Sequence, residues 1–193
     1  IGTGGLTMIP NYKAFADANA VGSALIVTSL VLQQAANGLG RVVWGWVSDR
    51  HGRCRTMVVA FTIHGVALFL LPVLGGSAVA ALFVAPVVLF TWGEAYALLP
   101  ALVGDRYGAR HTAGNQGLLY SSKGVASLVG GALIAWVAAA AGWTAAFWTV
   151  SALALFAASG AYALGRLTSS PRDSSVEPAA DAVREEGVSG RVE

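Results

Sequence analysis

The chain has 193 residues, of which 55% are hydrophobic and only 11% are charged, and its formal net charge is +2. Soluble domains usually carry about 25% charged residues, so this composition excludes an ordinary soluble domain and favours an integral membrane protein. The small net charge argues against nucleic-acid binding. A single cysteine, Cys54, excludes an internal disulfide framework and fits no metal-ligand spacing.

The chain opens with a short apolar stretch, residues 1–9. It is too short to cross a bilayer, which takes about 20 residues. We therefore expect it to be the end of a helix whose start lies outside this sequence. Pro10, Asn11 and Asp17 are turn-forming residues and predict a loop after it.

Five apolar runs long enough to span a bilayer follow, separated by glycine-rich or polar links. They cover about residues 21–47, 56–74, 77–103, 113–141 and 143–167. Residues 169–193 are instead rich in Ser, Pro, Glu, Asp and Arg, which predicts a disordered tail. The sequence thus predicts an all-α integral membrane unit over residues 1–168, followed by that tail.

Arginines mark one side of these spans. The opposite links are uncharged, and the first outer loop offers Lys13 as its only cation. Because Lys and Arg concentrate in cytoplasmic loops, the arginine side and the tail are predicted to face the cytoplasm from the inner (plasma) membrane. A truncated first helix plus five spans predicts the C-terminal six-helix half of a twelve-helix protein, with the N-terminal half as its missing partner. The arginines concerned are Arg50, Arg53, Arg55, Arg106, Arg110, Arg166 and Arg172.

Two cations interrupt the apolar runs, Arg41 in the first and Lys123 in the fourth. A charged side chain near the bilayer centre costs about 2.5–3.5 kcal/mol on insertion scales, which indicates that both charges are used. At 1.5 Å per residue, both lie about 12–14 Å from the cytoplasmic boundary of a ~30 Å core. We expect them to hold an anion in transit. The alternatives are a snorkelling Arg41 and a structural ion pair at Lys123.

Aromatic and polar side chains reach the same depth on neighbouring runs. Trp92 and Tyr96 lie one turn apart and share a face of the third run. They are predicted to form either a wall of a substrate cavity or an ordinary helix contact. Gln34, Asn37 and Arg41 share a face of the first run, and such a polar stripe is expected to face a bundle interior or a wet cavity.

Glu94 is a third charged residue within the apolar runs. If ionised, it would reduce the positive charge of the site and favour a monocarboxylate, or a proton carried with the substrate. It lies two residues from both Trp92 and Tyr96, so it is expected to point away from their face, toward a partner helix or polar backbone. His64, in the second run, is predicted to be a packing residue.

The link after the first span contains the pattern G-x-x-x-D-R-x-G-R-x-R, and residues 105–108 repeat its D-R-x-G core. The central glycine permits a tight reversal between two helices. The pattern resembles the signature loop of the major facilitator superfamily. The resemblance implies a gating loop in which the acid and the arginines bridge helices as the cytoplasmic side closes. The residues concerned are Gly45, Asp49, Arg50, Gly52 and Arg53.

Three further segments resemble the eighth, tenth and eleventh helices of the oxalate/formate antiporter family. They are Asn-Gly-Leu-Gly-Arg at 37–41, Phe-Thr-Trp-Gly-Glu-Ala-Tyr at 90–96, and Asn-Gln-Gly-Leu-Leu-Tyr-Ser-Ser-Lys-Gly at 115–124. The resemblance, which covers nearly all of residues 1–167, implies that Arg41 and Lys123 bind substrate carboxylates. It also implies that aromatic residues line the cavity. The candidate cavity residues are Trp92, Tyr96, Tyr120, Asn37, Gln34 and Glu94.

These observations predict a transporter of small carboxylate anions that exchanges a dicarboxylate for a monocarboxylate by alternating access. No cofactor, metal site or enzymatic nucleophile–base pair is expected. Two alternatives stay open. One is a proton-coupled monocarboxylate symporter of the same superfamily, with Glu94 as its titrating group. The other is a membrane sensor or a truncated fragment that does not transport.

Overall fold

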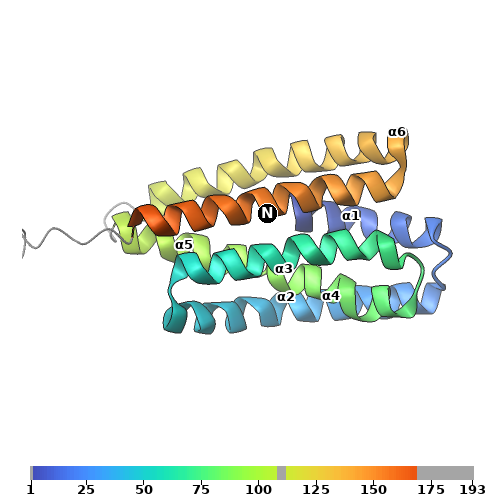
Figure 1. The fold of residues 1–193 in the computed structure, drawn as a ribbon, viewed down its shortest axis with the longest axis horizontal. Helices are drawn as coiled ribbons and strands as arrows, with labels where there is room; N and C mark the ends of the chain where they lie inside the picture. The colour runs from blue at the N-terminus through green and yellow to red at the C-terminus, as the bar shows by residue number, and fades with distance from the viewer. Residues whose placement is uncertain (1, 108–111, 169–193) are drawn as a thin grey trace, which may run out of the picture.

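A computed structural model describes residues 2–107 and 112–168, and every regular element in those ranges is helical (Figure 1). The predicted all-α class is therefore confirmed for these residues, whereas the predicted tail, 169–193, lies outside them. The elements are α1 (Gly2–Ala18), α2 (Ser23–His51), α3 (Arg53–Leu74), the π-helix η1 (Ala80–Val84), α4 (Ala85–Trp92), α5 (Glu94–Tyr107) and α6 (Thr112–Thr168).

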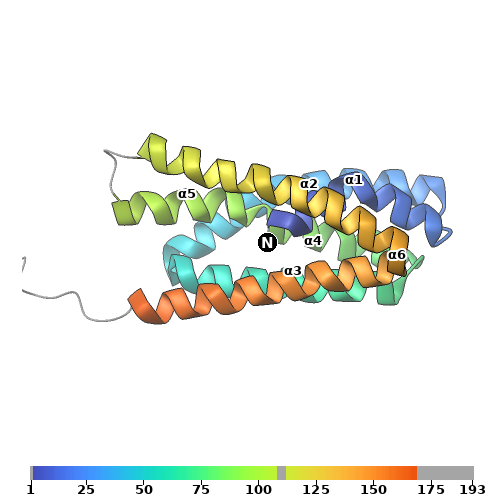
Figure 2. The same ribbon diagram turned by 90° about the horizontal axis from the view of Figure 1, so that it is seen from above.

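Each of the five predicted apolar runs is helical. α2 and α3 correspond to the first two runs, and η1, α4 and α5 follow one another along the third. α6 contains the last two apolar runs. They are separated at Gly142, which has φ 84° and ψ 167°, a conformation that glycine adopts far more readily than other residues. Figures 1 and 2 show the result: α6 consists of two arms that run in opposite directions and meet at one end of the bundle.

Three stretches of the described residues are long and apolar enough to cross a membrane. They are Arg53–Leu74, Ala80–Asp105 and Ala113–Arg166, and the last contains both arms of α6. α2, with 29 residues, is not among them, because Gln33, Gln34, Asn37 and Arg41 interrupt its apolar sequence. α2 therefore has the length of a span but needs a polar environment along one side.

α1 continues past Pro10 to its end at Ala18, so the loop predicted at this position is wrong. Met8, Tyr12 and Phe15 recur on one helical face, and all three are at most 2% exposed. A proline inside a helix costs about 3 kcal/mol, which is comparable to the gain from burying only one or two large apolar side chains. Burial of this face therefore outweighs the local preference of Pro10 for a turn.

α3 and the second arm of α6 form one side of the bundle and lie next to each other in both ribbon views (Figures 1 and 2). The Ser151 hydroxyl donates a hydrogen bond to the Gly65 carbonyl across this contact, at 2.7 Å. The Phe69 and Trp148 rings stack, with centroids 5.4 Å apart. α2, η1, α4 and α5 also contact α3.

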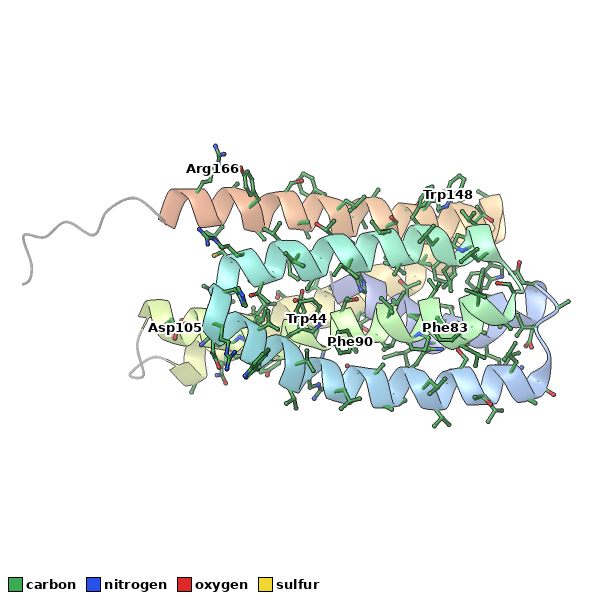
Figure 3. The ribbon with its side chains drawn as sticks, turned by 60° about the horizontal axis from the view of Figure 1, so that its bottom comes forward. Trp44, Phe83, Phe90, Asp105, Trp148 and Arg166 are labelled. Carbon is green, nitrogen blue, oxygen red and sulfur yellow. The ribbon has the colours of Figure 1, made fainter. Side chains whose placement is uncertain are left out.

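Glycines allow two further helix pairs to approach closely. A Cβ added at Gly40 of α2 would overlap the carbonyl oxygen of Phe90 in α4. One added at Gly130, in the first arm of α6, would lie 3.3 Å from Thr3 of α1. α2 therefore packs on α4, and the first arm of α6 packs on α1. Figure 3 shows Trp44 of α2 beside Phe90, where its indole N–H donates to the Phe90 carbonyl at 3.2 Å.

A buried polar network fastens α1 and α2 to the π-helix. The Ser29 hydroxyl donates to the Ala81 carbonyl at 2.5 Å and lies 2.7 Å from the Tyr12 hydroxyl. The Gln33 amide donates to Ser29 Oγ at 3.1 Å. A π-helix disturbs the regular pattern of backbone hydrogen bonds. Ser29 of the neighbouring helix therefore supplies an additional hydrogen bond to the buried carbonyl of Ala81.

Candidate functional site

The predicted gating loop is a single-residue break between two helices. α2 ends at His51, α3 begins at Arg53, and Gly52 between them has φ 88° and ψ 146°. The Gly52 N–H donates to the Ser48 carbonyl at 2.9 Å and closes the last turn of α2. A side chain at this positive φ would be strained, so the reversal requires glycine here.

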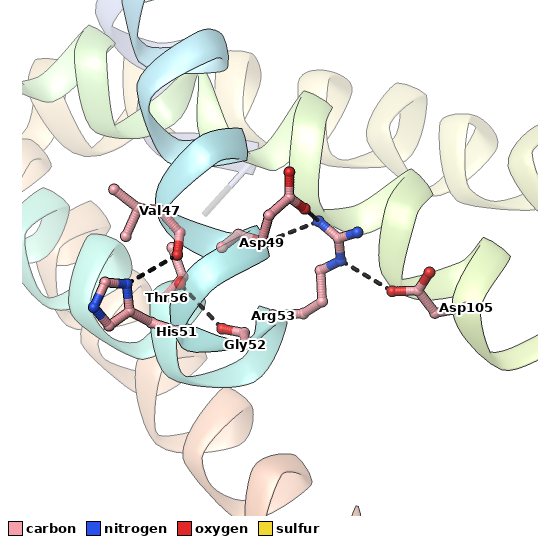
Figure 4. Close-up of polar contacts among 8 residues, drawn as sticks. Val47, Asp49, His51, Gly52, Arg53, Thr56 and Asp105 are labelled. Atoms are coloured by element: carbon pink, nitrogen blue, oxygen red, sulfur yellow. Dashed lines mark hydrogen bonds and ion pairs between the residues drawn. The ribbon is translucent and has the colours of Figure 1, made fainter.

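Arg53 joins three helices at this end of the bundle (Figure 4). Its Nη1 lies 2.9 Å from Asp49 Oδ1 on α2, and its Nε lies 3.0 Å from Asp105 Oδ2 on α5. Nη1 also donates to the Ser48 hydroxyl at 2.9 Å. The Arg53 side chain is only 25% exposed. We call Asp49, Arg53 and Asp105 the arginine latch.

The structure separates the other predicted loop residues from this latch. The Arg50 guanidinium carbon lies 4.1 Å from the centroid of the Trp46 ring, a contact within α2. A Cβ at Gly45 would meet nothing within 4 Å. Of the predicted gating residues, Asp49 and Arg53 therefore bridge helices. Asp105, which sequence reasoning noticed only as a repeat of the D-R-x-G pattern, completes the contact.

We expect the latch to be measurable as a non-additive effect on stability. Exposed ion pairs contribute about 0.2–1 kcal/mol, and the half-buried Arg53 with two carboxylates should lie near the upper end. Arg53→Gln should lower the midpoint of thermal denaturation, and adding Asp105→Asn should lower it no further. Arg55→Gln with Asp105→Asn is the control pair and should behave additively. Additive effects of Arg53→Gln and Asp105→Asn would contradict a direct latch.

The polar stripe on α2 lies beside the break between α4 and α5. Gln34 and Arg41 are exposed and Asn37 is partly buried. A Cβ at Gly93, which separates the two helices, would lie 2.6 Å from the Asn37 carbonyl oxygen and 3.4 Å from the Arg41 backbone nitrogen. Gly93 thus lets the chain between Trp92 and Glu94 pass directly against the stripe, a role that the sequence alone did not indicate.

Trp92 and Glu94 flank Gly93, and both are buried. Trp92 is 4% exposed, and its ring packs so closely on α1 that a Cβ at Gly5 would overlap it. The helix contact left open as an alternative for Trp92 is therefore present. Glu94 is fully buried, and neither of its carboxylate oxygens has a hydrogen-bond partner among the described residues. The side chain of Tyr96 lies outside the described part of the structure.

Lys123 and Tyr120 lie on the first arm of α6. Lys123 is partly buried and shares a helical face with Gly130, which contacts α1. Tyr120 is 48% exposed. α2, which carries Arg41, packs on α4, whereas the first arm of α6, which carries Lys123, packs on α1.

His64 is fully buried in α3, as expected of a packing residue. Its Nδ1 lies 3.0 Å from both the Val88 carbonyl oxygen and the Thr91 hydroxyl. On the opposite side, a Cβ at Gly4 would overlap the ring. His64 therefore joins α3 to α4 and leaves room for α1 only because position 4 is a glycine. No local sequence pattern indicated this contact.

The apolar helices and the charged and polar residues placed among them define a multi-pass membrane protein. The family model of the major facilitator superfamily matches residues 3–189, and the chain belongs to this superfamily. It thus belongs to a family of membrane transporters. Over 145 residues it is 35% identical to the oxalate:formate antiporter of Oxalobacter formigenes. That alignment covers 75% of this chain and 35% of the relative, so the chain spans about a third of the relative's length.

Proposed function

We propose that this chain is the C-terminal six-helix part of a transporter that exchanges small carboxylate anions, a dicarboxylate against a monocarboxylate. The observation that carries the proposal is the pair of cations, Arg41 and Lys123, on two helices of a chain that is similar to an oxalate:formate antiporter. Charged residues within membrane helices usually mark ion or substrate pathways. The complementary part of the site would come from an N-terminal half.

In this proposal, the anion binds between the two cations. The planar guanidinium of Arg41 matches a carboxylate with two parallel hydrogen bonds, and Lys123 supplies a compact charge for the other end. Trp92, Tyr96 and Tyr120 would bound the site, and Gln34 and Asn37 would supply polar contacts. The protein would change its access only with an anion bound, which couples the movement of one substrate to the return of another.

The arginine latch would close one end of the pathway. Its three residues come from α2, α3 and α5, so they can hold these helices together only while the helix ends stay close. Opening toward this side would separate them. The arginine-rich composition of this end supports a cytoplasmic orientation in the plasma membrane.

Counterflow in proteoliposomes tests the proposal. The full-length gene product is reconstituted into vesicles loaded with oxalate, formate or lactate, and uptake of labelled oxalate is followed. We expect internal oxalate or formate to accelerate uptake strongly, with little dependence on a pH gradient. Equal uptake into loaded and empty vesicles would contradict carboxylate exchange.

Proton-coupled monocarboxylate transport is the second candidate, and the burial of Glu94 favours it. A buried carboxyl group that has no hydrogen-bond partner in the described part of the chain is an unusual feature that is often functional. In this mechanism, Glu94 takes up and releases the coupled proton. Uptake of lactate should then follow an imposed pH gradient, and Glu94→Gln should abolish that dependence. Unchanged pH dependence in Glu94→Gln would exclude this role.

A further inference from the structure

The π-helix η1 leaves the carbonyl of Ala81 without the hydrogen bond that an α-helix would give it. In an α-helix the Ala85 N–H would donate to Ala81, but here it donates to the carbonyl of Ala80, five residues back. The next residue along the chain is Pro86, which has no N–H to donate. Ala81 is only 2% exposed, so bulk water does not replace the missing donor. The carbonyl therefore depends on a donor from another helix.

Ser29 of α2 supplies that donor. Its hydroxyl proton goes to the Ala81 carbonyl at 2.5 Å, because a carbonyl oxygen can only accept. Ser29 Oγ therefore accepts from its two other neighbours, the Gln33 amide at 3.1 Å and the Tyr12 hydroxyl at 2.7 Å. All three side chains are at most 1% exposed. The hydroxyl is thus held in one direction, and it reaches η1 only while α2 stays packed against it.

The π register determines where the side chains after η1 point. An α-helix turns by about 100° per residue, and a π turn contains one extra residue. If η1 became α-helical while the residues before it stayed in place, each later side chain would turn to the direction now taken by the residue after it. Trp92 would leave Gly5 of α1 and point where Gly93 now points, toward Asn37 of α2. A Cβ at Gly93 would already lie 2.6 Å from the Asn37 carbonyl oxygen, so an indole fits there only if α2 and α4 separate.

We propose that η1 is a two-state register switch and that Ser29 is the residue that positions Trp92 through it. While α2 is packed on α4, Ser29 holds the Ala81 carbonyl and η1 keeps the π register, with Trp92 against α1. When α2 moves away, the Ala81 carbonyl takes the Ala85 N–H, η1 becomes α-helical and Trp92 turns toward the polar stripe. Each register gives this carbonyl a donor, so the helix has two discrete arrangements. That Trp92 bounds the carboxylate site in one of these states rests on the proposed function, whereas the switch itself does not.

The contact between Trp92 and Gly5 is the readout, because the Trp92 ring is the group that a Cβ at Gly5 would overlap. For the full-length protein in detergent, we measure how far Gly5→Ala lowers the midpoint of thermal denaturation. We expect a Ser29→Ala background to reduce this lowering to at most about half, whereas a merely structural role of Ser29 would leave it unchanged. Ser151→Ala is the matched control. It also removes a buried serine hydroxyl that donates to a backbone carbonyl, that of Gly65 at 2.7 Å, but at the contact of α3 with α6, so it should leave the lowering unchanged.

Pro86→Ala tests the switch without removing any side-chain hydrogen bond, and it serves if Ser29→Ala does not fold. It adds an N–H at residue 86 that can donate to the Leu82 carbonyl and so completes the α-helical register. This variant should also reduce the effect of Gly5→Ala. The same lowering in the Pro86→Ala, Ser29→Ala and native backgrounds would overturn the proposal.

Fluorine NMR observes Trp92 directly. The full-length protein is labelled with fluorotryptophan, and the signal that is absent from Trp92→Phe belongs to Trp92. Ser29→Ala should move or split that signal, and Ser151→Ala should leave it in place. An unmoved Trp92 signal in Ser29→Ala would contradict a switch held by Ser29. None of these measurements reads carboxylate exchange, so a failure of the switch is distinguishable from a failure of the proposed function.

Discussion

Replacing Lys123 by glutamine is expected to lower the rate of dicarboxylate exchange by at least about 30-fold. Removing one partner of a hydrogen-bonded, desolvated charge pair costs about 2–5 kcal/mol, and 2 kcal/mol corresponds to a factor of about 30. Lys123 is partly buried on the α1-facing side of α6, so water replaces its charge poorly. The measurement is the initial rate of oxalate counterflow in proteoliposomes. Near-normal exchange in Lys123→Gln would remove the main support for the proposed site.

A control and two variants of Arg41 test whether the charge or its geometry is required. Lys13→Gln also removes one lysine, but Lys13 is exposed and paired with Asp17 on the surface of α1, so exchange should be unchanged. Arg41→Lys keeps the charge and removes the planar fork. It should retain part of the exchange and lose discrimination between substrates with differently oriented carboxylates. If Arg41→Lys and Arg41→Gln lose activity equally, the fork rather than the charge is required.

The positions of the helices could be predicted from the sequence because their causes are local. Apolar runs of sufficient length fixed the approximate extents of α3 and of both arms of α6. Gly52 and Gly142 marked reversals that the structure contains at those residues. α1 is the exception, since Pro10 and Asn11 have a local preference for turns. The buried face of Tyr12 and Phe15 overrides that preference, and no local pattern reveals what those side chains meet.

For the candidate site, the sequence predicted only the level at which each residue lies along its helix. Counting residues placed Arg41, Trp92 and Lys123 at similar levels, but it could not determine the direction in which each helix turns its side chains. The contact of Trp92 with Gly5 joins residues far apart in sequence, and so does the ion pair between Arg53 and Asp105. Such contacts depend on how helices pack. A glycine that permits close approach resembles any other glycine in the sequence.

The packing of α1 on Trp92 leads to the second large effect. Gly5→Ala should lower the free energy of unfolding by about 1–3 kcal/mol or more, because the added Cβ would overlap the Trp92 ring and a filled interior yields only by moving helices or side chains. Any movement of Trp92 would also shift the neighbouring Gly93 against α2. Carboxylate exchange should therefore fall together with the midpoint of thermal denaturation in detergent.

Gly160→Ala is the matched control for Gly5→Ala. Gly160 also lies in a helix, but a Cβ there meets nothing within 4 Å. Alanine is favoured over glycine in a helix by about 1 kcal/mol, so Gly160→Ala should leave stability unchanged or raise it.

The cause can be isolated by repeating Gly5→Ala in a Trp92→Ala background, where the obstructing ring is gone. In that background the substitution should no longer destabilise. If instead Gly5→Ala is as harmless as Gly160→Ala in the native background, α1 does not pack on Trp92 as the structure has it, and the position of Trp92 beside the proposed pathway is wrong as well.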